Sequence, residues 1–237
     1  SDAVFDELMD RYTALADSLG VSEHERLDAQ PGADHTEGFV TVEHRAPMLS
    51  LEKLSPARRD SKGEAMSSAD QLRAWYERRR KELELAPEAP LALMVEPKID
   101  GISVSLTYAD GKLVRAVTRG DGRKGDDITR QVKEARAVTL VLEGVSGELE
   151  IRGELYWPRP AFEAYNRKLK EAGEKPIINP RNGCAGLMKR KDPTGLGAVG
   201  VRSFMYQVAW AEGARLPSKQ SEIIRWLEQA GATVYQS

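Results

Sequence analysis

The chain has 237 residues, of which 41% are hydrophobic and 30% are charged, and its formal net charge is −2. This composition is typical of a soluble globular protein with one large core or two small ones, and the net charge gives no sign of nucleic-acid binding. No apolar run reaches the length of a membrane span and no signal-peptide pattern is visible, so we expect no membrane partner. A single cysteine, Cys184, excludes an internal disulfide, and no Cys or His cluster has zinc-site spacing. Cytoplasmic residence is therefore expected.

Apolar residues at helical spacing predict two helices in the first third of the chain. The first ends at Gly20, and residues 21–65, rich in Pro, Gly and Ser, are expected to be mostly irregular. The second begins at the cap Ser67-Ser68, and its basic run 78–81 is expected to face solvent. The apolar positions are Val4, Leu8, Tyr12, Leu15 and Leu19 in the first helix and Leu72, Trp75, Tyr76 and Leu83 in the second.

From Leu91 onward the pattern changes to that of strands. The segment 91–108 is predicted to form a hairpin with 112–118 across Ala109-Asp110-Gly111. A short helix is expected over 127–135, capped by Asp126, and a strand over 148–157. In that strand the predicted inward residues are Leu149, Ile151, Leu155 and Trp157, and the predicted outward residues are Glu150, Arg152 and Glu154.

The last part of the chain alternates helices with strands. We expect a helix from Pro160 to Gly173, a strand over 201–210, a helix capped by Ser218 and ended by Gly231, and the beginning of a strand at 233–235. Hairpins and segregated helices favour an α+β fold of largely antiparallel sheets flanked by helices over a doubly wound fold.

The run Gly120-Asp121-Gly122-Arg123-Lys124-Gly125 matches the dinucleotide fingerprint G-x-G-x-x-G. However, the preceding strand returns from a hairpin and does not belong to a βαβ unit. Asp121, Asp126 and Asp127 would also repel a pyrophosphate at the start of the next helix. We therefore interpret the run as a tight turn that carries Arg119 and Asp121 into a pocket.

The most informative run is Glu96-Pro97-Lys98-Ile99-Asp100-Gly101, at the start of a strand-like segment. At the strand period of two, Glu96, Lys98 and Asp100 project to one side. Burying three unpaired charges costs several kcal/mol per ion, so the group lines a polar pocket or lies on a solvated face. In the pocket interpretation Lys98 is a nucleophile. The pattern K-x-D-G alone is weak, and its meaning depends on the motifs that accompany it.

Residues 175–191 carry five basic side chains and no acidic one. This stretch is a candidate phosphate-contacting patch, although on charge alone a solvated basic loop fits equally well. The basic residues are Lys175, Arg181, Lys189, Arg190 and Lys191.

Six segments in a fixed order resemble the adenylation domain of NAD-dependent DNA ligases, within the lysine-adenylating nucleotidyltransferase superfamily. The resemblance runs from near residue 2 to about 210 and implies the nucleotidyltransferase fold. It also implies that residues 1–45 are the remnant of an N-terminal helical segment that binds nicotinamide mononucleotide (NMN), with a linker, and that 46–237 are an adenylation domain whose C-terminal part is missing. The segments are Asp2–Asp6, His44–Leu51, Glu96–Gly101, Arg119–Gly122, Arg152–Glu154 and Asn179–Asn182.

The resemblance implies a reaction in which Lys98 attacks the adenylyl phosphorus of NAD+. The products are lysyl-AMP and free NMN, and the AMP is later passed to the 5′-phosphate of a nick in double-stranded DNA. A free lysine has a pKa of about 10.4, and the nearby carboxylates Glu96 and Asp100 stabilise the ammonium form. Mg2+ and further cations are therefore expected to offset them, with Mg2+ near Asp100 and Glu154 as one possibility.

The same resemblance assigns roles to the remaining site residues. Asp100 supports the lysine, Glu96 recognises the adenine amine, and Arg119 and Glu154 address the ribose. Tyr206 stacks on adenine, although a core aromatic is an equally good interpretation of that position. The further residues are Asp2, Phe5 and Asp6 for the NMN half, Ser50 and Leu51 for the nucleotide pocket, and Arg181 and Lys189 for DNA phosphates.

The sequence departs from the family pattern in ways that bear on function. Lys189 stands where the family has a second arginine, and Phe5 replaces the usual tyrosine. The upstream Tyr and His that help to hold NMN are not in this sequence, and two later lysine motifs, expected after residue 235, are not in it either. We therefore expect slow self-adenylation, or none, and no unaided nick sealing. A monomer is the default.

Two rival interpretations remain. One is an ATP-using member of the superfamily, such as a DNA or RNA ligase or a capping enzyme, which would share Lys98, Glu154 and the aromatic residue. Segments 2–6 and 48–51 count against it because they resemble the NAD-specific family. The other is a non-catalytic nucleotide- or DNA-binding module, which the truncated set of motifs favours.

Overall fold

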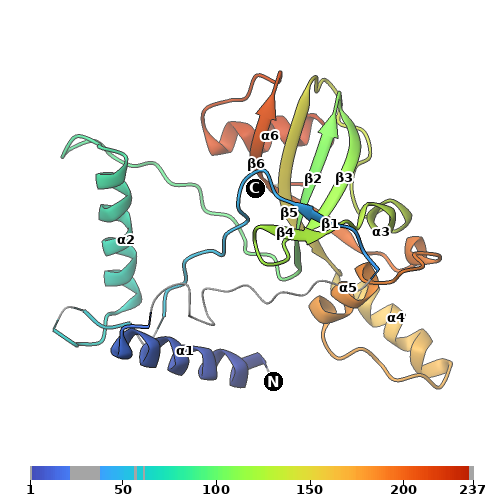
Figure 1. The fold of residues 1–237 in the computed structure, drawn as a ribbon, viewed down its shortest axis with the longest axis horizontal. Helices are drawn as coiled ribbons and strands as arrows, with labels where there is room; N and C mark the ends of the chain where they lie inside the picture. The colour runs from blue at the N-terminus through green and yellow to red at the C-terminus, as the bar shows by residue number, and fades with distance from the viewer. Residues whose placement is uncertain (1, 22–37, 56–57, 61, 235–237) are drawn as a thin grey trace. The chain divides into compact units, whose positions relative to one another are not determined.

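A computed structural model describes residues 2–21, 38–55, 58–60 and 62–234. The contacts within the chain divide it into two units, one made of residues 1–32 and 49–93 and the other of residues 33–48 and 94–237. Figure 1 labels the elements of both. The boundary predicted after residue 45 separates the NMN-binding segment from the adenylation domain and does not coincide with the division into these two units. It stays a prediction.

The first unit contains the two predicted helices, α1 (Asp2–Leu19) and α2 (Ser68–Glu82). α1 is followed by Gly20, and α2 begins where the Oγ of Ser67 accepts a hydrogen bond from the backbone N–H of Asp70. Gln71 is buried on α2, and its side-chain amide binds both backbone groups of Ser55. Both helix predictions are confirmed. The basic run is less solvated than expected, because Arg80 binds the carbonyls of Ala86 and Pro87.

The second unit is built on one four-stranded antiparallel sheet of order β3-β2-β5-β6 (Figure 1). Its strands are β2 (Ile102–Ala109), β3 (Lys112–Thr118), β5 (Glu148–Tyr156) and β6 (Arg202–Glu212). A second sheet pairs β1 (Thr41–Glu43) with β4 (Lys124–Asp126). The β2–β3 hairpin turns at Asp110 and Gly111, which both have positive φ. The antiparallel sheets and segregated helices confirm the predicted α+β class.

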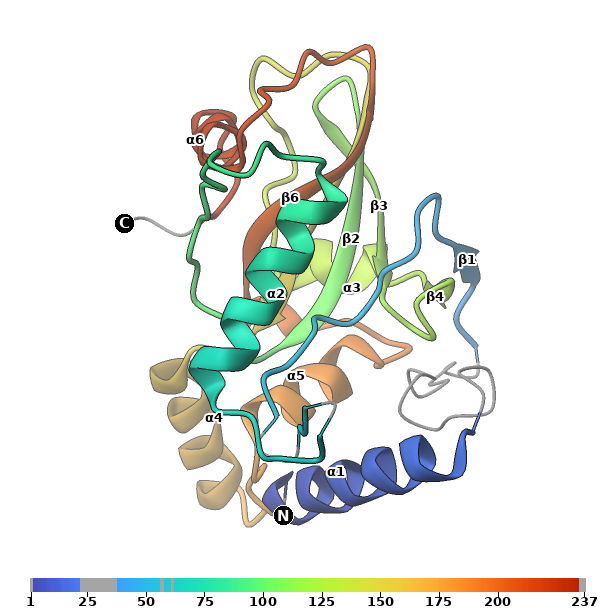
Figure 2. The same cartoon turned by 90° about the vertical axis from the view of Figure 1, so that its left-hand side faces the viewer.

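Four α-helices accompany the sheet in this unit: α3 (Thr129–Glu134), α4 (Arg159–Glu171), α5 (Pro180–Met188) and α6 (Gln220–Gln229). A short 3-10 helix covers Leu196–Ala198. α4 and α5 lie near one end of the sheet, away from α6, in both Figure 1 and Figure 2. The core contains the apolar face of the sheet together with residues of the helices, among them Leu106, Leu149, Ile151, Leu155, Leu187, Met188 and Leu227.

The opposite face of β5 is also covered, which corrects the prediction that Glu150 and Arg152 point outward. Glu150 is 4% exposed and Arg152 is 6% exposed. The guanidinium of Arg152 lies 3.0 Å from Oε1 of Glu150 and also donates to the carbonyl oxygens of Ala46 and Pro47. The segment before Met48 therefore covers this face, and alternation along β5 alone could not reveal it.

The strand predicted from residue 91 is too long, because β2 begins only at Ile102. Among the described residues, no strand pairs with 91–101, and Pro97 has no N–H to contribute to a ladder. The alternation over Glu96–Asp100 is thus a property of an extended segment and not of a sheet.

Two helix starts also differ from the predictions. α3 begins at Thr129, where the carboxylate of Asp127, not that of Asp126, accepts from the backbone N–H and hydroxyl of Thr129. α6 has Lys219 at its N-cap position and no side-chain cap, so the predicted cap Ser218 is wrong.

α5 was not predicted at all, since its sequence was interpreted as a basic patch or loop. Asn179 caps it by accepting from the backbone N–H groups of Arg181 and Asn182, and Pro180 occupies the first helical turn. Asn before Pro is a typical helix start, and this signal was available in the sequence. Of the predicted final strand, Thr233 accepts a backbone hydrogen bond from Met205, and Tyr235 lies outside the described residues.

Candidate active site

Glu154 lies at the centre of the charged residues that the motifs point to. β5 places it opposite Ser103 of β2, and the Ser103 hydroxyl donates to its Oε1 over 3.3 Å. Burial raises the pKa of Glu154, while this hydrogen bond and the positive charges of Lys98, Arg181 and Arg119 oppose the rise. Three motifs that are far apart in the sequence therefore place their cations close enough to act on one carboxylate.

Gly101, the glycine of the K-x-D-G pattern, is required at its position for a steric reason. A Cβ at Gly101 would lie 2.2 Å from the carbonyl oxygen of Leu155 and 2.9 Å from Cγ of Glu154. Only glycine lets the Lys98–Asp100 segment pass so close to β5. Gly153 meets the same restriction on the other side of the strand, where a Cβ would lie 2.3 Å from the carbonyl oxygen of Phe204. Gly101 thus permits the close packing of the Lys98–Asp100 segment against β5, and Gly153 permits that of β5 against β6.

Asp100 and Arg181 meet at the surface. Nη1 of Arg181 lies 3.4 Å from Oδ1 of Asp100, and their side chains are 54% and 68% exposed. Arg181 is held there because it belongs to the first turn of α5. Lys189, the second predicted DNA-binding residue, follows the other end of that nine-residue helix, about 12 Å away along its axis. The structure therefore brings Arg181, but not Lys189, to Lys98 and Glu154.

Tyr206 occupies an irregularity in β6. Arg152 pairs with Gln207 and Gly153 with Met205, so Tyr206 is an extra residue with no partner in the register. Burial and the charge of Glu154 raise the pKa of Tyr206, while Arg152, a hydrogen bond with Ser103 and Arg119 oppose the rise. Tyr206 is half-buried and is not among the residues of the apolar core, and its role in the site stays a prediction.

Glu96 is connected to Tyr206 by a residue that the sequence analysis missed. The side-chain amide nitrogen of Gln220 donates to Oε2 of Glu96 over 3.3 Å and to the carbonyl oxygen of Tyr206 over 2.7 Å. Oε1 of Glu96 is buried, and no hydrogen-bond donor among the described residues reaches it. No motif marked Gln220, because a glutamine at the start of a helix carries no distinctive signal.

The Gly-rich run forms a turn, as predicted, and not a dinucleotide loop. The backbone N–H of Arg119 donates to the carbonyl oxygen of Ser103, which fixes the start of the turn beside the site. Asp121 does not deliver its carboxylate to a pocket as expected, since Oδ1 accepts from the backbone N–H groups of Arg123 and Lys124 and closes the turn. Gly125 then lies in β4 and does not begin a helix.

A family model for the NAD-dependent DNA ligase adenylation domain matches residues 36–237. The chain belongs to that family. It is 40% identical to a DNA ligase of Hahella chejuensis over 98% of the chain and 33% of the relative. It is 38% identical to a DNA ligase of Heliobacterium modesticaldum, over 99% of the chain and 32% of the relative. It is 35% identical to a DNA ligase of Haloferax volcanii, over 99% of the chain and 31% of the relative. The adenylation domain thus spans about a third of the length of these curated relatives, and the resemblance inferred from the motifs is confirmed.

Five of the predicted site residues belong to the first unit. Asp2, Phe5 and Asp6 lie at the start of α1, and their side chains are outside the described part of the chain. Ser50 is exposed, and Leu51 is 72% exposed. Because these residues belong to the other unit, their place relative to the adenylation site stays a prediction.

The predicted magnesium position lies near Asp100 and Glu154, in the described part of the adenylation domain. Nowhere among the described residues do three or more His, Cys, Asp or Glu side chains converge as metal ligands. Asp100 pairs with Arg181, and Glu154 is influenced by three cations that would repel a divalent ion. Magnesium near Asp100 and Glu154 therefore stays a prediction from the sequence. Within the same described ranges, no helix is both long and apolar enough to span a membrane.

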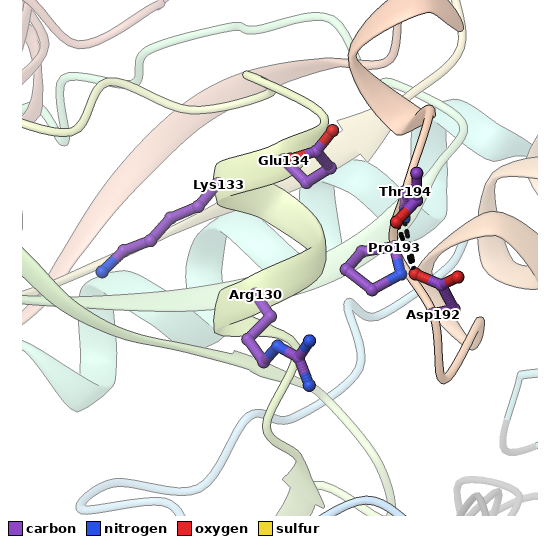
Figure 3. A pocket seen from close by; sticks show the side chains of 6 residues that line it. All are labelled: Arg130, Lys133, Glu134, Asp192, Pro193 and Thr194. Atoms are coloured by element: carbon purple, nitrogen blue, oxygen red, sulfur yellow. Dashed lines mark hydrogen bonds between the residues drawn. The ribbon is translucent and has the colours of Figure 1, made fainter.

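A cavity of about 460 Å³ lies at α3 and the turn after α5 (Figure 3). None of the predicted site residues lines it. The carboxylate of Asp192 is occupied in the turn, where the hydroxyl and backbone N–H of Thr194 donate to it and lower its pKa. This cavity is therefore separate from the Glu154 site. Its lining residues are Arg130, Lys133, Glu134, Asp192, Pro193 and Thr194.

Proposed function

We propose that the chain carries out the first step of NAD-dependent DNA ligation. Nζ of Lys98 attacks the adenylyl phosphorus of NAD+, a P–N bond forms, the P–O bond to NMN breaks, and NMN leaves with that electron pair. In the whole protein the AMP then passes to the 5′-phosphate of nicked double-stranded DNA. The observation that carries the proposal is the convergence of Lys98, Arg119 and Arg181 on Glu154.

The same convergence bears on the reactivity of the amine. A lysine attacks only in its neutral form, and nearby carboxylates favour the ammonium. Here the charge of Glu154 is shared by two arginines as well as by Lys98, and Arg181 also pairs with Asp100. The described residues thus already supply two cations that weaken the hold of the carboxylates on Lys98. Asp100, two residues from Lys98, is proposed to orient the amine.

The adenine end of NAD+ is proposed to bind between Glu96 and Tyr206. Oε1 of Glu96 is a buried acceptor without a donor among the described residues, which suits the exocyclic amine of adenine. The ring of Tyr206 offers a stacking surface worth about 1–3 kcal/mol per base. Arg119 and Glu154, whose charges both act on the pKa of Tyr206, are assigned to the ribose.

The remaining roles follow the family pattern as proposals. Ser50 and Leu51 line the nucleotide pocket, and the start of α1 takes the NMN half through Asp2, Phe5 and Asp6. Arg181 and Lys189 contact DNA phosphates, residues 46–237 act as the adenylation domain, and the protein works as a monomer. No step is assigned to Mg2+, and its place near Asp100 and Glu154 stays a prediction from the sequence.

The test is the intact mass of the chain after incubation with NAD+ and Mg2+, beside a Lys98→Ala control. The expected result is a slowly formed AMP adduct that requires Lys98 and disappears when NMN is added. An adduct formed from ATP but not from NAD+ would favour the ATP-using members of the superfamily. Binding of NAD+ with no adduct on this chain, nor on its full-length parent measured in parallel, would leave a non-catalytic nucleotide-binding module.

A further inference from the structure

We propose that Gln220 is a positioning residue that aims Glu96 at the base and so sets the preference of the site for adenine. The proposal rests on the proposed function only in that the site takes a purine nucleotide. Gln220 is the first residue of α6 and lies outside every motif that identified the family.

One amide nitrogen of Gln220 holds two separate parts of the site. It donates to the carbonyl oxygen of Tyr206 over 2.7 Å and to Oε2 of Glu96 over 3.3 Å. A primary amide carries two N–H groups, so both hydrogen bonds can be made at once. The Tyr206 carbonyl belongs to the extra residue of the β6 irregularity. Gln220 thus ties the proposed stacking residue to the proposed base-reading residue.

The contact with Gln220 involves only one of the two carboxylate oxygens of Glu96. Oε2 accepts from Gln220, whereas Oε1 is buried and receives no hydrogen bond from any residue that the structure describes. Glu96 lies in an extended segment that pairs with no described strand, so no sheet fixes the direction of its side chain. The contact with Gln220 is what leaves Oε1 as the acceptor for a ligand.

A fixed carboxylate acceptor discriminates between purines by the group at position 6. Adenine presents an amine there, which donates, whereas hypoxanthine and guanine present a carbonyl oxygen, which would face Oε1 as a second acceptor. A buried polar atom without a partner is costly, so the wrong base is rejected. If Glu96 could rotate, it would turn towards solvent and this rejection would weaken.

A role in folding alone predicts something different. Gln220 does not cap α6, because the N-cap residue Lys219 makes no side-chain cap and the Gln220 amide is directed to Tyr206 and Glu96. A purely structural Gln220 would change stability and weaken AMP and IMP binding equally. A positioning residue changes the ratio of the two affinities.

The experiment measures binding of AMP and of IMP to this chain by calorimetry. Four proteins are compared: wild type, Gln220→Met, which keeps the length of the side chain and removes the donor, Gln220→Lys, which keeps a donor, and Gln229→Met as a matched control. Gln229 is exposed at the last turn of the same helix. We expect wild type, Gln220→Lys and Gln229→Met to prefer AMP, and Gln220→Met to lose at least about tenfold of that preference.

Two results would overturn the inference: a full AMP preference in Gln220→Met, or a wild type that does not distinguish AMP from IMP. If Gln220→Met fails to fold, Gln220→Asn, whose amide is one methylene too short to reach Glu96, is measured in its place. Failure of the proposed function is seen separately, as the lack of a Lys98-dependent adduct in wild type. An AMP preference that depends on Gln220 would stand even then.

Discussion

The two faces of β5 are both shielded from water, but different interactions stabilise them. On one face Leu149, Ile151 and Leu155 are fully buried in apolar contacts. On the other face Arg152 is buried against Glu150 and two backbone carbonyls, while Glu154 faces three cations. Apolar burial stabilises in proportion to area, whereas buried charges are tolerated only while each keeps its partner. The polar face therefore carries chemistry at a risk to stability that the apolar face does not share.

Removing Arg152 should have the largest effect on stability. Arg152→Met leaves the buried carboxylate of Glu150 unpaired and frees the carbonyl oxygens of Ala46 and Pro47. We expect the free energy of unfolding to fall by about 3–5 kcal/mol, measured by urea denaturation. Adding Glu150→Gln should restore part of the loss, because the unpaired charge is then gone. If the double variant were as unstable as the sum of the two single variants, the charges would not be coupled.

The second prediction concerns Gly101, which lets the segment of Lys98 approach β5 closely. Gly101→Ala places a methyl group against the backbone of β5 at Leu155, so the Lys98 segment must move away from Glu154. We expect a loss of about 1–3 kcal/mol and a slower adduct formation with NAD+. Gly186→Ala is the matched control, because this helical glycine of α5 has open space around it. That control should be neutral or more stable by about 0.5–1 kcal/mol.

The sequence predicts the apolar face of β5 better than the polar face. Alternation identified the apolar face of β5, the β2–β3 hairpin and the α+β class, because these depend on neighbours in the sequence. It could not predict that Arg152 is buried, since the covering carbonyls come from a segment about 105 residues earlier. Gln220 was missed for the same reason, as Glu96 is 124 residues away from it. Contacts with residues far away in the sequence determine the environment of a polar side chain, and the alternation of apolar and polar residues along a strand does not predict these contacts.

The motif residues themselves were better predicted than their surroundings. Lys98, Arg119, Glu154 and Arg181 do converge, because the spacing of a family motif carries the long-range contacts that periodicity lacks. The helix that positions Arg181 was nevertheless overlooked, although Asn179 and Pro180 signalled its start. Charge composition misled here, since a basic stretch was judged by its net charge and not by its caps.

The titration of Glu154 gives a smaller and pH-dependent effect. Burial raises the pKa of Glu154 above its ordinary value of 4.5, so the folded state binds a proton there more tightly than the unfolded state. The contribution of Glu154 to stability is therefore fully present below about pH 4.5 and is lost as pH rises through the raised value. Each pKa unit by which the folded and unfolded states differ changes the free energy of unfolding by about 1.4 kcal/mol. In Glu154→Gln, the unfolding free energy measured between pH 4 and pH 7 should lack this decline. An identical pH profile in both proteins would contradict it.

The Asp100–Arg181 pair should matter least for stability and yet strongly for chemistry. Both side chains are more than half exposed, and an exposed ion pair contributes roughly 0–1 kcal/mol. Asp100→Asn should therefore leave the unfolding midpoint almost unchanged while it slows formation of the Lys98 adduct at least about tenfold, because the carboxylate that is proposed to orient the amine and that pairs with Arg181 is lost. Asp70→Asn is the matched control, since Asp70 forms a similarly exposed pair with Arg73 on α2. Equal adduct rates in the two variants would show that Asp100 is only a surface charge, and would contradict the orienting role proposed for it.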